Sequence, residues 1–148
     1  MGTRRKSREL AMQMLFQGDL GKQTPDEVRK LFWASVADVD ADTRGFTEDL
    51  YRVATTRQEE IDALIESHAQ NWRIERMPVV DRNLIRAAVA EMLGYPNTPA
   101  AIIINETLEQ ALDRAGLKAG NKGFEAAIAA IEMVSIQRKL GANGPGKR

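Results

Sequence analysis

Four basic side chains, those of Arg4, Arg5, Lys6 and Arg8, gather close together near the start of the chain. Guanidinium and ammonium groups bind phosphate oxygens, and arginine also makes planar contacts with base edges. Gln13 lies one to two turns further along and carries an amide that suits base edges. These residue types in this order favour the binding of RNA by a short basic arm.

The cluster lies where a helix tolerates it least. Apolar and small residues recur at intervals of three and four and predict an amphipathic helix that starts among the basic residues: Ser7, Leu10, Ala11, Met14 and Leu15. The first turn of a helix carries partial positive charge, so each cation there costs roughly 0.3–1 kcal/mol. One explanation is that RNA phosphates offset this cost; the alternative is a solvated, frayed helix start.

The sequence lacks the residues and motifs that common metal sites and catalytic sites require. The chain has no cysteine and a single histidine, which excludes thiolate and paired-histidine metal sites. His68 is expected to pack against the core, because it falls on the apolar side of a predicted helix. Glycine-rich phosphate loops and nucleophile turns are absent from the sequence. We therefore expect no enzyme, no cofactor and no bound metal.

Composition points to an ordinary globular protein. Of 148 residues, 43% are hydrophobic and 28% charged, and 21 basic residues balance 21 acidic ones. A net charge of zero means that any nucleic-acid binding must come from a local patch. We find neither a segment that could span a membrane nor a signal peptide, and therefore expect a cytoplasmic protein.

The remaining pattern predicts helices throughout. Thr24, Pro25 and Glu27 form a capping box that starts a second helix, whose expected buried side is Val28, Leu31, Phe32, Ser35 and Val36. A polar loop is expected over residues 38–45, and one long helix over residues 46–68.

A short helix should end before Pro78, and a longer one should run over residues 80–93. Thr98 and Pro99 should cap the next helix, and a last helix is expected over residues 122–140. The isoleucine-rich residues 101–105 also fit a β-strand, but that strand would have no partner.

Three segments in the same order resemble the NusB family of transcription antitermination proteins. They are RRKSRELAMQMLF (residues 4–16), NWRIERMPVVDRNLIRAAVAEML (residues 71–93) and PAAIIINETLEQAL (residues 99–112). The resemblance implies an all-α fold of about seven helices in two packed three-helix bundles. The bundles would span residues 1–70 and 71–140. The composition of residues 141–148, GANGPGKR, predicts a disordered tail.

The resemblance also implies a role without catalysis. Members of the family bind the boxA element of ribosomal RNA leader transcripts as single-stranded RNA. They do so jointly with NusE, a protein that is also part of the small ribosomal subunit. The assembly joins the transcription elongation complex and helps RNA polymerase read through terminators.

By position, the resemblance assigns Arg4, Arg5, Lys6, Arg8 and Gln13 to the RNA surface and Glu75 and Asp81 to the protein partner. Asp81 has a structural alternative, as a helix N-cap beside its ion-pair partner Arg82. Asn105 and Glu106 are expected to tie one bundle to the other.

Near the end, the sequence departs from the family pattern. GFEAAIAAIEM, residues 123–133, lacks the usual Asn-Gly pair. This leaves Lys122 and Phe124 as the candidates for RNA contact there, and Phe124 also fits a core position.

Two alternatives stay open. The fold also resembles the N-terminal domain of some RNA cytosine methyltransferases, but no cofactor-binding α/β segment follows in this sequence. The other is a helical protein–protein adaptor or homodimer in which the basic arm binds no RNA.

Overall fold

The helical periodicity of the sequence is realised in a computed structural model, which describes residues 3–68 and 73–115. Those residues contain no β-strand, so the all-α prediction is confirmed and the strand alternative for residues 101–105 is wrong. The expected last helix lies outside the described residues. Six α-helices and one 3₁₀ helix follow in order: α1 (Thr3–Gly21), α2 (Pro25–Ser35), α3 (Ala41–Thr56), α4 (Gln58–His68), η1 (Ile74–Arg76), α5 (Val79–Gly94) and α6 (Ala100–Ala115).

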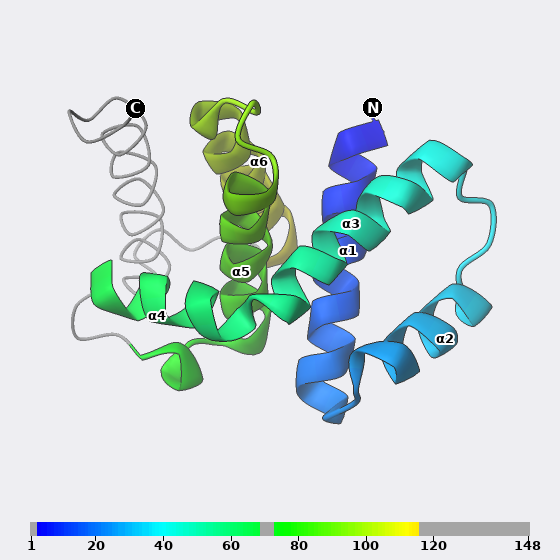
Figure 1. Cartoon of the computed structure of the whole chain (residues 1–148), viewed down its shortest axis with the longest axis horizontal. Helices are drawn as coiled ribbons and strands as arrows, with labels where there is room; N and C mark the ends of the chain where they lie inside the picture. The colour runs from blue at the N-terminus through cyan, green and yellow to red at the C-terminus, as the bar shows by residue number, and fades with distance from the viewer. Residues whose placement is uncertain (1–2, 69–72, 116–148) are drawn as a thin grey trace, which may run out of the picture.

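Helix α1 lies in the middle of the N-terminal half, in contact with α2, α3 and α5 (Figure 1). The stripe expected to be buried is confirmed, since Ser7, Leu10, Ala11, Met14 and Leu15 are all covered. Met12, off that stripe, is also buried, because α1 has neighbours on more than one side.

Helix α2 begins as the sequence predicts. The Thr24 hydroxyl accepts a hydrogen bond from the Glu27 amide, and the Thr24 amide donates one to the Glu27 carboxylate at 2.8 Å. Of the side expected to be buried, Val28 and Phe32 are covered. Leu31, at 50% exposure, was wrongly placed there, as was Ser35, which is exposed. Val28 and Phe32 are the buried residues of α2, so its buried stripe is narrow.

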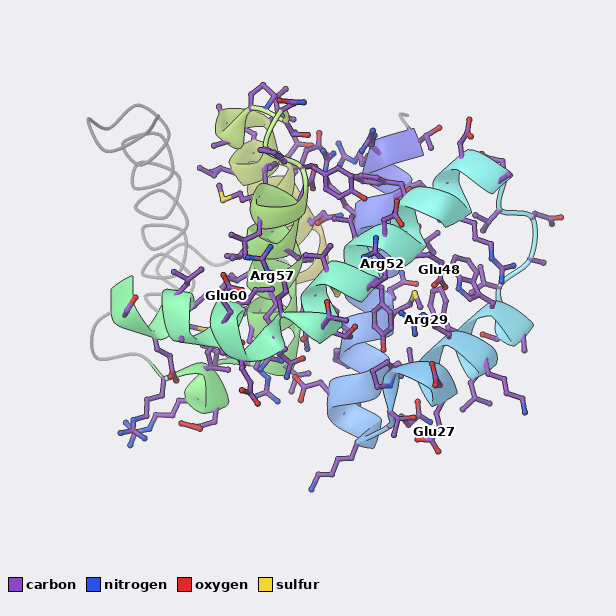
Figure 2. All side chains as sticks on the ribbon, in the orientation of Figure 1. Glu27, Arg29, Glu48, Arg52, Arg57 and Glu60 are labelled. Atoms are coloured by element: carbon purple, nitrogen blue, oxygen red, sulfur yellow. The ribbon has the colours of Figure 1, made fainter. Side chains whose placement is uncertain are left out.

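Polar contacts hold α2 to α3. The Arg29 guanidinium lies 3.0 Å from the Glu48 carboxylate (Figure 2). The Trp33 indole N–H donates to the same carboxylate. Glu48 therefore accepts hydrogen bonds from two residues of α2, and these bonds fix the position of α2 against α3.

The prediction for residues 38–68 was wrong at two points. The expected loop is shorter, because the Asp40 carboxylate accepts from the Thr43 amide at 2.7 Å and starts α3 at Ala41. The expected single long helix is two helices, α3 and α4, divided at Arg57.

Threonine side chains accompany this division. The hydroxyls of Thr55 and Thr56 donate to the carbonyls of Tyr51 and Arg52, a type of bond that bends helices. The apolar spacing nevertheless continues across the bend, from Leu50 and Val53 to Ile61 and Ile65. The Ile61 amide also still bonds to the Arg57 carbonyl. Periodicity alone could not have located it.

Helix α5 is the centre of the molecule and contacts α1, α3, α4 and α6. Its predicted core residues, Leu84, Ile85, Ala88, Val89 and Met92, are all buried, and η1 ends before Pro78 as expected. The main hydrophobic core runs from Leu10 in α1 to Ile103 in α6. Residues on both sides of the expected boundary near residue 70 therefore share one core.

Helix α6 starts after Pro99, whose carbonyl accepts from the amides of Ile102 and Ile103. Ile103 is buried, whereas the side chains of the later expected core positions Leu108, Ala111 and Leu112 lie outside those described. None of the helices in the described ranges is long and apolar enough to cross a membrane.

Candidate nucleic-acid interface

The four cations at the start of α1 have different surroundings. Arg4 and Lys6 are exposed, Arg5 is half-buried, and Arg8 is buried at 9% exposure. Further along the helix, Gln13 is half-buried. The structure therefore does not present the basic arm as one uniform charged surface.

Arg8 is bound inside the protein. Its Nε and Nη2 atoms donate to the two carboxylate oxygens of Glu91 in α5, each at 2.7 Å. Burial opposes the charged form, but the Glu91 carboxylate, with Glu106 nearby, raises the pKa of Arg8. Arg8 thus joins α1 to α5, a structural role that its place in a basic cluster did not suggest.

Arg5 contacts the acidic side of α6. Its Nη1 atom lies 2.6 Å from Glu109 Oε2, and its Nε atom 4.0 Å from Glu106 Oε2. Glu106 Oε2 is also 3.9 Å from Arg8 and, within the described residues, is buried without a hydrogen bond. Glu106 therefore links α6 to α1, as expected, and Asn105 is exposed.

These carboxylates change the account of the helix start. The cost of placing cations in the first turns of α1 is offset within the chain, because Glu91, Glu106 and Glu109 face Arg5 and Arg8. RNA is therefore not needed to explain these two arginines. Arg4 and Lys6 remain the more accessible cations of the arm.

Arg4 lies against aromatic rings. Its guanidinium carbon is 3.8 Å from the centroid of the Phe46 ring in α3 and 5.7 Å from that of Tyr95, in the turn between α5 and α6. The two rings are 4.9 Å apart. Burial, together with the neighbouring Asp49 carboxylate, raises the pKa of Tyr95 to about 12.

A second polar region lies at the other end of α1. Asp19 accepts from Arg82 at 2.7 Å and from Asn83 at 3.0 Å, while Arg86 bridges Asp19 and Asp62. Burial acts to raise the pKa of Asp19, but these hydrogen bonds and positive charges lower it. This network connects α1, α4 and α5, and within it Arg82 pairs with Asp19.

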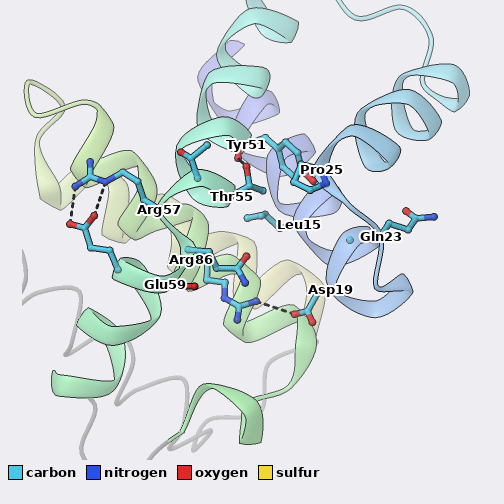
Figure 3. Close-up of a pocket in the computed structure, with 13 residues that line it drawn as sticks. Leu15, Asp19, Gln23, Pro25, Tyr51, Thr55, Arg57, Glu59 and Arg86 are labelled. Atoms are coloured by element: carbon cyan, nitrogen blue, oxygen red, sulfur yellow. Dashed lines mark hydrogen bonds and ion pairs between the residues drawn. The ribbon is translucent and has the colours of Figure 1, made fainter.

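The Asp19 network borders a cleft of about 810 Å³ (Figure 3). Tyr51, Thr55 and Glu59 line it, together with Asp19 and Arg86. Its arginines are already paired with carboxylates, Arg57 with Glu60 and Arg86 with Asp19 and Asp62. Among the described residues, no group of side chains could hold a metal ion.

Comparison with known proteins decides the family. A model of the NusB family matches residues 5–121. The transcription antitermination protein NusB of Koribacter versatilis is 59% identical over 108 residues, which are 73% of this chain and 74% of the relative. The chain belongs to the NusB family. The NusB protein of Desulforapulum autotrophicum is 40% identical over 129 residues, 86% of this chain and 87% of the relative.

Solved structures show the same fold. A chain in the crystal structure of the antitermination factors NusB and NusE in complex with dsRNA matches with a TM-score of 0.77 and 23% identity. The match covers 93% of this chain and 98% of that one. The NusB-like all-helical fold expected from the sequence is thereby confirmed.

The residues that NusB membership suggested for a protein partner lie in η1 and α5. Glu75 is exposed, whereas Asp81 has only 6% exposure. Asp81 is not the N-cap of α5, because that position belongs to Pro78. It lies in the first helical turn, where a carboxylate faces the positive end of the helix dipole.

Two expected RNA residues are not described. Lys122 and Phe124 lie outside the described residues, and the NusB family match ends at residue 121, just before them. The side chain of His68, expected in the core, also lies outside what is described. Phe46 and Tyr95, which the sequence did not indicate as site residues, lie beside Arg4 of the arm.

Proposed function

We propose that this chain is a transcription antitermination factor that binds boxA-type RNA together with NusE. The observation that carries the proposal is its 59% identity to a transcription antitermination protein NusB. The basic first turns of α1 support an RNA surface, and the similar structure holds NusB, NusE and RNA in one complex. The chain acts by binding and without catalysis, in the cytoplasm, where bacterial transcription occurs.

The structure divides the arm by accessibility. Arg4 and Lys6 are exposed and Arg5 is half-buried, so these three can meet RNA phosphates at the surface. Arg8 would first have to leave a buried carboxylate, which costs several kcal/mol in comparable pairs. We therefore assign direct RNA contact to Arg4, Arg5 and Lys6, and assign to Arg8 the task of holding α1 in place.

A binding experiment tests this proposal. Labelled boxA-like RNA, as a single strand and as a duplex, is titrated with the chain at several salt concentrations, with and without NusE. The variant carries Arg4→Gln, Arg5→Gln and Lys6→Gln and leaves Arg8 intact, so that the buried pair remains. We expect the variant to bind more weakly and with a shallower salt dependence, by about 0.7 log units per tenfold salt for each phosphate that it no longer neutralises.

A matched control removes the same charge elsewhere. Lys22, Lys30 and Arg44 are exposed and lie outside the arm, so Lys22→Gln, Lys30→Gln and Arg44→Gln should leave RNA binding close to wild type. Equal weakening in both triple variants would mean that net charge alone matters. No RNA binding by the wild-type chain, even with NusE, would reject the proposal and leave the adaptor or homodimer as the better explanation.

A further inference from the structure

Arg4 is held in place although it is exposed. Cations at a helix end are normally solvated and mobile, but the Arg4 guanidinium lies at van der Waals distance, 3.8 Å, from the centre of the Phe46 ring. Tyr95 borders the same guanidinium at 5.7 Å. An aromatic ring therefore lies against the guanidinium on one side, and the side chain still reaches solvent.

The supporting rings come from separate parts of the chain and are themselves fixed. Phe46 belongs to α3, has only 8% exposure and packs with Ala11 and Leu50. Tyr95 packs on Phe46 with the rings inclined at 58°, and its phenol interacts with Asp49. The position of Arg4 is thus determined by tertiary packing of α1, α3 and the turn after α5.

We propose that Arg4, held on Phe46 and Tyr95, is a stacking platform for one unpaired RNA base. The inference rests on the proposed function and extends it, because it gives Arg4 a contact other than a phosphate. Unpaired bases stack on guanidinium planes as well as on aromatic rings. A platform that is already immobilised loses little further conformational entropy when the base arrives.

The neighbouring cations suit this arrangement. Lys6 and Arg5 lie in the same turns of α1 and can contact phosphates near the stacked nucleotide. Phe46 and Tyr95 act as positioning residues that hold the Arg4 guanidinium in place. Because a paired base cannot occupy the platform, it favours single-stranded RNA over a duplex of the same sequence.

Arg4→Lys separates stacking from charge. Lysine keeps the positive charge but has no planar group, so the salt dependence of RNA binding should stay unchanged while affinity falls roughly fivefold. The substitution touches an exposed side chain and should leave the fold intact. Arg44→Lys is the matched control, since Arg44 lies 4.5 Å over the Trp33 ring and outside the arm; it should bind RNA like the wild type.

An abasic scan of the RNA identifies the stacked nucleotide. Each base is removed in turn, and binding to the wild type and to Arg4→Lys is measured in the presence of NusE. We expect one position at which base removal weakens the wild type about fivefold and leaves Arg4→Lys unaffected. Tyr95→Phe should behave like the wild type, whereas Tyr95→Ala should resemble Arg4→Lys.

The outcomes distinguish this inference from the proposed function. If the wild type binds RNA but Arg4→Lys responds to base removal at every position as the wild type does, the platform is rejected and RNA binding stands. The same holds if Arg4→Lys binds as tightly as the wild type. If the wild type binds no RNA even with NusE, both proposals fall.

Discussion

The pair formed by Arg8 and Glu91 places two full charges in the contact between α1 and α5. Glu91 is only 1% exposed, and the two hydrogen bonds at 2.7 Å satisfy both of its oxygens. A buried pair of this kind offsets its desolvation cost only while both partners are present. At the residue scale, Arg8 therefore has a structural role before any contact with RNA is considered.

Removing one partner should cost far more than replacing both. Arg8→Met leaves a buried carboxylate, and we expect the free energy of unfolding to fall by about 3–5 kcal/mol. The double variant Arg8→Met with Glu91→Leu should recover most of that stability. Urea denaturation of Arg8→Met, Glu91→Leu and the double variant measures the free energy of unfolding. If the losses in the two single variants simply add up in the double variant, the two side chains do not stabilise each other.

Asp19 makes stability depend on pH. Its pKa is lowered in the folded chain by the hydrogen bonds from Arg82 and Asn83, despite burial. A lowered folded-state pKa stabilises the protein above the unfolded pKa of about 3.9, and this stabilisation is lost as the pH falls through the folded value. Asp19→Asn should cost about 1–3 kcal/mol at pH 7 and make the variant less sensitive to pH below about 4.

Thermal melts of the wild type and of Asp19→Asn between pH 7 and pH 3 would check this pH dependence. Asp26 is a matched control, because its exposed carboxylate lies 3.3 Å from Arg29 at the surface. Asp26→Asn should follow the wild-type pH dependence. A stability difference between Asp19→Asn and the wild type that stays constant down to pH 3 would exclude Asp19 as a source of the dependence.

At the scale of elements, the acidic side of α6 lies against the basic start of α1. Glu109 is 52% exposed and Arg5 30%, so their contact contributes little to stability, on the order of 0–1 kcal/mol. It nevertheless occupies the guanidinium that we assign to RNA phosphate. RNA and α6 would then compete for Arg5.

Glu109→Gln should therefore strengthen RNA binding. With the competing carboxylate removed, we expect about a twofold to threefold gain in affinity, with little change in the melting temperature, because the pair is solvent-exposed. Filter binding at low and physiological salt measures the gain. Glu60→Gln removes an exposed carboxylate that pairs with Arg57 far along the chain, and it should leave RNA affinity unchanged.

At the scale of the whole molecule, the arm and Glu75 lie apart. In Figure 1 the start of α1 is at the top of the view, and η1, which carries Glu75, is at the bottom. Core helices α1 and α5 connect the two regions. An RNA surface and a partner surface could therefore be altered one at a time.

Substitution at each surface should have a separate effect. Glu75→Lys reverses an exposed charge on the proposed partner surface, and we expect NusE affinity to fall about tenfold while RNA binding by the chain alone is preserved. The arm variant should show the reverse. Calorimetry with NusE and titration with RNA test both; loss of both activities in Glu75→Lys would mean that the surfaces are coupled or overlap.

Local features explain what could be predicted. The α1 stripe, the capping box at Thr24 and the core of α5 depend on residues three or four apart, and all three are confirmed. The bend at Arg57 was missed because apolar spacing continues across it. Leu31 was wrongly placed on the buried side of α2, because spacing does not show how much of a helix surface its neighbours cover.

The sequence by itself determined the helical class, most helix starts and the basic arm, because these are set by neighbouring residues. Only the tertiary structure decided what each cation of the arm does. Arg8 meets Glu91 across 83 positions of the chain, and Arg5 meets Glu109 across 104. Pairings over such distances depend on how α1, α5 and α6 pack, and no local pattern encodes that packing. Four adjacent charges therefore divide into a buried ion pair, a contact with α6, a stacked guanidinium and an exposed lysine.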